Sequence, residues 1–291
     1  MERLFVFKRS IRKPYFSPDT TNEHEVKALM LKPIDITLIA MNAALYAAIG
    51  LVVYFVFPVV APTVGGVRFW PVVVIPATFS LLFGATVGGV GAAIGIFISD
   101  TLIHGDPLLS LAVGVPANFV AFSVIGYLSN KALDWKKTFL SLGIGVAILA
   151  TLAYLVITPE DVINYFGVSF NEAMLNIYIV LAIFIISYII VISVGYARPK
   201  WRSFGAASVV GAIIGSAIIG VGLWAYTQLF ALPAAIGGAA NLPYYAGLIL
   251  FAWTFATEIP FMVILVPPIA EACYLAFPSV RRSQKTEKKA V

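Results

Sequence analysis

Three ionisable side chains stand at the edges of long apolar stretches or inside them, where such groups are rare. Arg68 precedes one stretch, Asp100 lies near the end of another, and Glu258 lies within the last. An arginine can hold a carboxylate or a phosphate through two parallel hydrogen bonds, whereas an aspartate can bind an amine or a hydroxyl group. Ionisable groups in apolar surroundings are candidate binding residues. These residue types therefore predict recognition of a small polar molecule.

The spacing of these residues predicts that they reach one level of the molecule. Arg68 lies 17 residues before a tight turn at Ala85, and Asp100 lies 15 residues after it, or about 25 and 22 Å of helix. Counting about 20 residues back from Phe277, one membrane crossing, places Glu258 at the same outer level. Either the three side chains share one ligand, or Arg68 only pairs with Asp100 and braces the mouth of a bundle.

Three further residues complete the candidate site, and each has a second interpretation. His104 lies four residues after Asp100 on the same helix face, but a single histidine near a loop could be structural or solvated. Asn118 could form the floor of a pocket, or it could bond a neighbouring helix or the carbonyl freed by Pro116. Trp70 could form a flat wall for a ligand, or it could belong to the aromatic belt at the outer interface.

The sequence lacks the residue patterns that catalysis or metal binding would need. The sequence contains no HExxH motif, no paired aspartates within an apolar stretch and no GxxxxGK[ST] phosphate loop. His24 lies in the N-terminal tail, and the single cysteine, Cys273, excludes an internal disulfide and a thiolate-rich metal site. We therefore expect no enzyme, no cofactor and no metal, and any ATP hydrolysis must occur in another chain.

Membrane helices are the elements that must position these residues. The chain of 291 residues is 60% hydrophobic and only 11% charged, with a mean hydropathy of +0.96, whereas soluble proteins are about 25% charged. Such a chain cannot cover a globule that faces water, so lipid must surround most of it. The composition predicts an all-α, polytopic membrane helix bundle and excludes soluble enzymes and nucleic-acid-binding proteins.

Eight stretches are apolar enough to be membrane helices, although the second is short. They cover residues 36–57, 69–83, 86–103, 108–130, 138–157, 173–197, 204–230 and 244–277. Lysine and arginine beside membrane spans stay on the cytoplasmic side, and eight crossings place every such residue except Arg68 on one side. The charge pattern thus predicts a multi-pass protein of the cell membrane with two basic cytoplasmic tails, residues 1–35 and 278–291.

Small residues repeat along several of these stretches. Ala40, Ala44 and Ala48 recur every fourth residue on the first one. In lipid, such a stripe lets a second helix backbone approach closely. The stripe could dock a partner helix or pack against the protein's own helices. We assign two similar rows to internal packing. The row on the third stretch is Gly84, Gly88, Gly91 and Gly95, and the row on the seventh stretch is Ala207, Gly211 and Gly215.

Several short motifs follow one another in a defined order. After the alanine stripe come Gly65-Gly66-Val67-Arg68, Leu82-Phe83-Gly84, Gly88-Gly89-Val90-Gly91, Ser99-Asp100, Gly114-Val115-Pro116-Ala117-Asn118-Phe119 and, near the end, Glu258-Ile259-Pro260 with Pro267-Pro268. In this order they resemble the substrate-binding S component of energy-coupling factor (ECF-type) transporters. The resemblance covers most of residues 36–130 and, more loosely, 204–277.

The resemblance implies a subunit that captures a vitamin or small metabolite. It would work with a transmembrane T subunit, docked at Ala40, Ala44 and Ala48, and with two cytoplasmic ATPase subunits. The family's six-helix core would comprise four helices in 36–130 and two in 204–277, so residues 138–197 would be an inserted helix pair. The alternative is a stand-alone secondary carrier or channel whose two halves alternate around a central site.

Overall fold

The computed structural model describes residues 32–61, 64–129 and 169–278, together with 131, 134, 136–141, 143–144, 147, 151, 160 and 163. Within these residues the protein is helical, and an isolated antiparallel bridge between Val60 and Arg68 is their only β pairing. Both predicted tails, residues 1–35 and 278–291, lie almost entirely outside the described residues.

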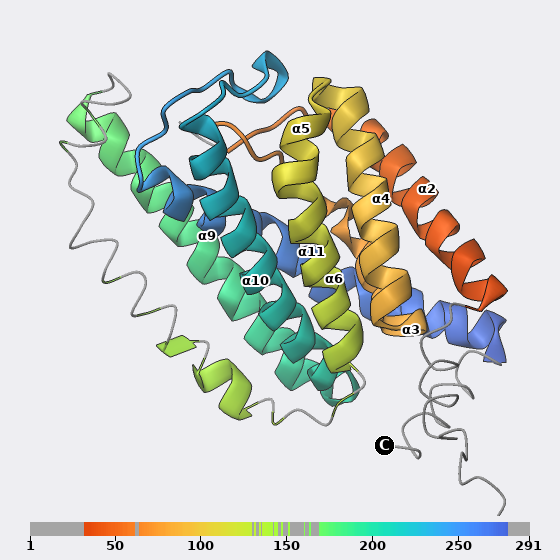
Figure 1. The fold of residues 1–291 in the computed structure, drawn as a ribbon. Coiled ribbons are helices and arrows are strands. Elements are labelled where there is room, and N and C mark those ends of the chain that lie inside the picture. Colours follow the sequence, from red (N-terminus) through yellow and green to blue (C-terminus); the bar gives the residue numbers. More distant parts are fainter. Residues whose placement is uncertain are drawn as a thin grey trace, which may run out of the picture. The chain divides into compact units, whose positions relative to one another are not determined.

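Long helices form the body of the molecule (Figure 1). They are α2 (Pro33–Val56), α3 (Val74–Phe83), α4 (Ala85–His104), α6 (Val115–Ser129), α9 (Phe170–Ala197), α10 (Arg202–Thr227) and α11 (Ala246–Ala276). Short turns of helix join them: η1 (Pro71–Val73), α5 (Pro107–Leu109), η2 (Ser110–Gly114), η3 (Pro199–Trp201) and η4 (Ala234–Ile236).

Five helical stretches are long and apolar enough to cross a membrane, so the chain is a multi-pass helical membrane protein. They are Pro33–Val56, Ala85–His104, Pro107–Ser129, Pro199–Thr227 and Ala246–Ala276. Each of these five stretches overlaps one of the eight predicted segments. In four of the five, both ends agree with the predicted ends to within a few residues.

The other three predicted segments do not add to this count. Segment 69–83 becomes the shorter apolar helix Pro71–Phe83. Segment 173–197 lies within the 28-residue helix α9, of which Ala182–Ala197 is the apolar part whose side chains are all described. Segment 138–157 lies largely outside the described residues. The predicted number of eight spans is therefore not confirmed.

Helices α4, α6 and α10 lie side by side, with α6 in the middle (Figure 1). Gly211 of α10 lies against Ala121 of α6, and Gly222 lies against Val113 in the turn that leads into α6. The two helices are therefore antiparallel. Helix α11 crosses behind them and packs against α10, α9 and α3.

A close contact joins α2 to α4. The amide nitrogen of Asn42 donates to the carbonyls of Val87 and Gly88 at 3.1 and 3.2 Å. A Cβ atom on Gly95 would lie 2.9 Å from the carbonyl oxygen of Ala43, so a larger residue would push the helices apart. The glycine row on α4 is thus internal packing, as predicted.

The contact between α2 and α4 leaves the opposite face of α2 exposed. Ala40, Ala44 and Ala48 are exposed, whereas Ala43 and Ala47 are buried against the bundle. The predicted stripe is therefore not an internal seam within the part of the chain that the structure describes. It lies on the outer surface of α2.

The hairpin of α3 and α4 forms at the predicted turn. Gly84 has φ +89°, a left-handed conformation that glycine adopts without strain. The hydroxyl of Ser80, just before the turn, donates to the carbonyl oxygen of Phe122 at 2.9 Å and ties α3 to α6. Together the turn and this bond set the position of α4 beside α6.

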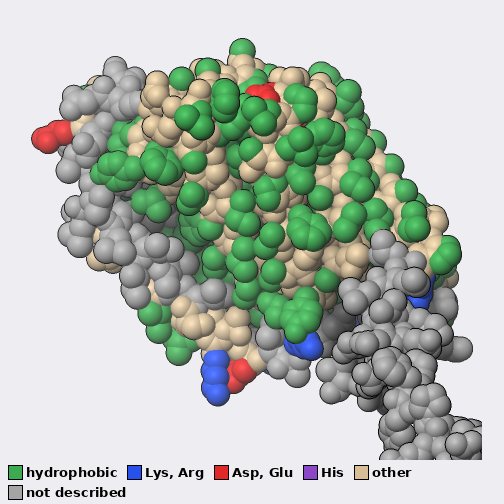
Figure 2. Space-filling model, viewed as in Figure 1, with side chains coloured by type: hydrophobic (Ala, Val, Ile, Leu, Met, Phe, Trp, Pro, Cys, Tyr) green, Lys and Arg blue, Asp and Glu red, His purple; other side chains and the backbone are tan. Residues whose placement is uncertain are grey.

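Basic side chains other than Arg68 gather at one end of the bundle in the described structure. Lys131 follows α6, Arg198 and Lys200 lie between α9 and α10, and Arg202 begins α10; antiparallel packing brings these segments together. Figure 2 shows lysine and arginine at the lower end of the visible face. This is the asymmetry that the charge pattern predicts, and the side of the membrane that this end faces stays a prediction.

Candidate functional site

A cavity inside the bundle brings all the predicted site residues together. Its wall includes residues from the loop before α3 and from α4, η2, α6, α10 and α11, among them Arg68, Trp70, Asp100, His104, Asn118 and Glu258. Its volume is about 80 Å³, which is enough to admit water. Apolar side chains, including Ile96, Val113 and Leu223, form much of the remaining wall.

Arg68 and Asp100 form an ion pair at this cavity. The Nη2 atom of Arg68 donates to Oδ1 of Asp100, and the two side chains are only 10% and 9% exposed. The hydroxyl of Ser110 donates to the second oxygen, Oδ2, at 2.8 Å. Both oxygens of Asp100 are therefore engaged, so Asp100 is less suited to bind an amine than the sequence suggested.

Arg68 keeps unused donors. Its Nη1 atom is buried and has no hydrogen-bond partner among the described residues. The loop that carries Arg68 is fixed by backbone bonds, from Ala61 to Val67 at 2.7 Å and from Phe69 to Val59 at 2.8 Å. The guanidinium lies 4.4 Å from the centre of the Trp70 ring, a distance at which cation and ring attract each other.

An irregular turn brings Ser110 to Asp100. Residues Ser110–Gly114 form one turn of π-helix, in which the N–H of Val115 donates to the carbonyl of Ser110. Gly114 lies against the carboxylate, since a Cβ there would be 2.7 Å from Oδ2 of Asp100. Single π turns within α-helices are frequent at functional sites. Sequence reasoning missed this turn, although Gly114 close before Pro116 is a signal of an irregular backbone.

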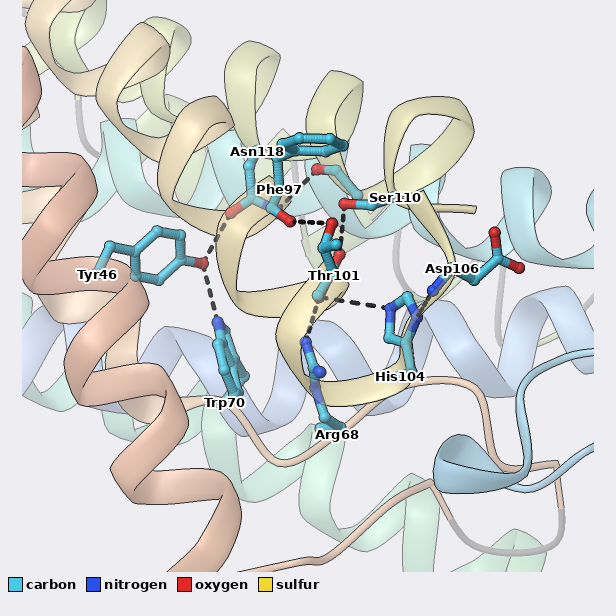
Figure 3. Close-up of polar contacts among 11 residues, drawn as sticks. Tyr46, Arg68, Trp70, Phe97, Thr101, His104, Asp106, Ser110 and Asn118 are labelled. Atoms are coloured by element: carbon cyan, nitrogen blue, oxygen red, sulfur yellow. Dashed lines mark hydrogen bonds and ion pairs between the residues drawn. The ribbon is translucent and has the colours of Figure 1, made fainter. Parts of the chain in front are cut away.

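A chain of hydrogen bonds fixes Asn118 and Trp70 (Figure 3). The indole N–H of Trp70 donates to the hydroxyl oxygen of Tyr46 at 2.9 Å, and that hydroxyl donates to Oδ1 of Asn118 at 2.8 Å. The Nδ2 atom of Asn118 donates to the carbonyl of Gly114 at 2.9 Å. Asn118 thus both bonds a neighbouring helix and lines the cavity, so its two predicted roles occur together.

The structure changes the assessment of two aromatic residues, Trp70 and Tyr46. Trp70 is only 4% exposed, so it lies inside the bundle and not in a belt at its surface. Tyr46 is 1% exposed and connects α2 to the site, although the sequence analysis did not select it. Its position on the face of α2 that also carries Asn42, away from the alanine stripe, is the signal that could have found it.

His104 is buried beside the ion pair. Its side chain is 4% exposed, and its Nε2 lies 3.8 Å from Oδ1 of Asp100. Its Nδ1 accepts the backbone N–H of Asp106 at 3.3 Å, which leaves the Nε2 proton of a neutral ring to face Asp100. His104 is therefore not solvated. Among the described residues, no three His, Cys, Asp or Glu side chains come close enough to hold a metal ion.

Asp106 closes the end of the bundle next to the cavity. Its Oδ1 accepts the N–H of Leu109 at 3.0 Å, and its Oδ2 accepts the hydroxyl of Tyr226 at 2.6 Å. Burial acts to raise the pKa of Asp106, but the hydrogen bonds from Tyr226 and Leu109 outweigh it and hold the pKa below its usual value. The loop after α4 is thereby tied to the end of α10.

Glu258 lines the same cavity as Arg68 and Asp100. It is 12 residues into α11, about 18 Å from the start of that helix. It shares with Asn118 both this cavity and a smaller one, which also contacts Phe122 and Met262. Within the described part of the chain, no hydrogen bond or ion pair involves its carboxylate. The site therefore offers free donors at Arg68 and a free carboxylate at Glu258.

Comparisons with known proteins give no match: no family model, no curated protein and no solved structure is significantly similar to this chain. The function is therefore argued from the cavity and the helix surfaces.

Proposed function

We propose that this chain is the membrane-embedded substrate-capture subunit of an energy-coupling factor transporter, which takes up a vitamin or small metabolite. The observation that carries the proposal is the convergence of six predicted polar or aromatic residues on one cavity within the bundle. Arg68 presents a buried nitrogen, Nη1, without a partner among the described residues, and the half-buried Glu258 lines the same cavity. A buried polar group without a partner costs about 1–3 kcal/mol, and a bound polar molecule offsets that cost.

The outer face of α2 supports the part of the proposal that concerns partners. Ala40, Ala44 and Ala48 are exposed, so a helix of a T subunit can approach the backbone of α2 closely. The sequence contains no phosphate-binding loop, so two cytoplasmic ATPase subunits would supply the energy. The assignment to this transporter class depends on this surface and on the order of the sequence motifs.

Purification of the tagged chain from its native membranes in mild detergent tests the proposal. We expect a T subunit and two ATPase subunits to co-purify, and the assembled complex to take up its substrate into liposomes only when ATP is hydrolysed. If the folded chain is recovered without these subunits, the transporter class is wrong, although capture in the cavity could still hold.

A stand-alone secondary carrier is the second candidate, and Glu258 is the observation that favours it. Acidic residues within membrane helices mark proton and ion pathways, and Glu258 lines the cavity from a helix that contains three prolines. The two candidates differ in their energy source. The purified chain alone in liposomes would accumulate substrate under a pH gradient if it is a carrier, and would not do so as a capture subunit.

A further inference from the structure

We propose that the cavity selects a molecule with a positively charged nitrogen at one end and a neutral hydrogen-bond acceptor at the other. Glu258 would hold the cation and Nη1 of Arg68 would donate to the acceptor. This inference rests on the proposed function, because it names the substrate class of the same cavity.

The first argument is the charge balance of the cavity wall. The positive charge of Arg68 is matched by Asp100, whose second oxygen is already bonded to Ser110. Glu258 is the remaining acid of the wall and has no ion-pair partner within the described residues. Glu258 is half-buried, so its carboxylate is only partly solvated, and a cation beside it would stabilise the charge. The cavity therefore favours a cationic group at Glu258.

The second argument concerns Arg68. The side chain is 10% exposed, and its Nη1 has no hydrogen-bond partner among the described residues. A ligand carboxylate there would bring a negative charge close to Asp100, which already neutralises this arginine, and like charges in a shared site repel. A neutral oxygen or ring nitrogen accepts the hydrogen bond without that repulsion.

The third argument concerns the rest of the cavity wall, apart from Arg68 and Glu258. This part of the wall is formed by Trp70 and by the apolar side chains of Ile96, Val113 and Leu223. The amide of Asn118 is already hydrogen-bonded to Tyr46 and to Gly114. It therefore fixes the shape of the cavity wall and is less available to bind a ligand. A flat ring suits walls of this kind, and the volume limits the ligand to a small molecule.

A matched series of probes tests the inference. The meta isomers of aminomethylpyridine, hydroxymethylpyridine and pyridinecarboxylate share one flat ring and one ring nitrogen, and at neutral pH they carry substituents that are cationic, neutral and anionic. Binding would be measured by calorimetry on the full chain in lipid nanodiscs. We expect the amine to bind roughly tenfold more tightly than either relative, which corresponds to about 1.4 kcal/mol.

Two variants on α11 identify the residue responsible. Glu258→Gln keeps the size of the side chain and removes its charge, so the preference for the amine should fall to within about twofold. Glu271→Gln is the matched control, because Glu271 lies on the same helix but outside the cavity, where it accepts a hydrogen bond from Lys200 at 2.9 Å. The preference should persist in that variant.

Each other outcome overturns the inference. Equal binding of the three probes, or tighter binding of the anion, contradicts the substrate class but leaves capture in this cavity standing. An amine preference that survives in Glu258→Gln shows that another group holds the cation. If none of the three probes binds the wild-type chain, the inference fails, while the co-purification of partner subunits still decides the proposed function.

Discussion

At the scale of single residues, the two terminal nitrogens of Arg68 meet different surroundings. Nη2 pairs with Asp100, while Nη1 has no hydrogen-bond partner in the described structure. One side chain thus contributes both to the stability of the bundle and to the binding surface of the cavity. A substitution that removes only one of these contributions can separate them.

Arg68→Lys is such a substitution, and Arg68→Ala is its counterpart. Lysine can keep the ion pair as a point charge but loses the second planar nitrogen, so we expect roughly tenfold weaker binding of aminomethylpyridine and little change in melting temperature. Alanine leaves Asp100 buried without its cation, which costs about 3–5 kcal/mol of stability. Calorimetry and thermal unfolding on the same samples measure both effects. If Arg68→Lys keeps full affinity, Arg68 only braces Asp100.

Gly114 offers a second test at this scale. In Gly114→Ala, the new Cβ would lie 2.7 Å from Oδ2 of Asp100, so the carboxylate must move away from Ser110. Overpacking of this kind costs about 1–3 kcal/mol, which a shift of thermal unfolding would detect. Gly205→Ala is the control, because no atom lies within 4 Å of the Cβ added to this helical glycine. Equal destabilisation in both variants would contradict the close contact.

At the scale of elements, the helices were predictable and the faces on which they meet were less so. Long apolar stretches predict helices because a helix satisfies its backbone hydrogen bonds within one segment in lipid, and the turn at Gly84 correctly placed Arg68 and Asp100 at one level. Glu258 lines the same cavity, and its depth in the membrane stays a prediction. Tyr46 was missed because the hydropathy of α2 does not show which face meets α4.

The exposed face of α2 carries a prediction of its own. Ala44→Trp should prevent assembly with a T subunit, because the large ring holds the partner backbone away, while the purified chain still folds and binds aminomethylpyridine. Leu45→Trp is the matched control on the same helix, since Leu45 is already bulky and 43% exposed. Co-purification of the subunits would be compared for the two variants. Loss of probe binding in Ala44→Trp would mean that this face matters for the fold itself.

At the scale of the whole molecule, the two ends of the bundle differ. Lys131, Lys200 and Arg202 lie at one end. The other end is closed by two loops, in which the N–H of Gly66 donates to the carbonyl of Ile236 at 2.6 Å, and both residues line the cavity. The charge pattern predicted this polarity, whereas the contact between loops so distant in sequence carries no signal in composition or periodicity.

The orientation of this polarity in the membrane can be measured. Basic clusters stay in the cytoplasm, so cysteines introduced at Lys136 and Lys200 should be protected from an impermeant maleimide in intact cells. A cysteine at Glu160 should be labelled. The background would be Cys273→Ser, which removes the only native thiol. Labelling of positions 136 and 160 from the same side would contradict the predicted topology.

The shortness of α3 has a consequence for how a ligand arrives. The helical stretch Pro71–Phe83 is about 20 Å long, whereas the hydrocarbon layer is about 30 Å thick. With Gly84 at one boundary of the hydrocarbon layer, the loop with Arg68 would lie about 10 Å below the opposite boundary. If the cavity captures a ligand as proposed, that ligand would lose much of its hydration shell before it reaches Arg68 and Glu258. We therefore expect dehydration at the entrance, more than the strength of the final contacts, to set how fast the cavity fills.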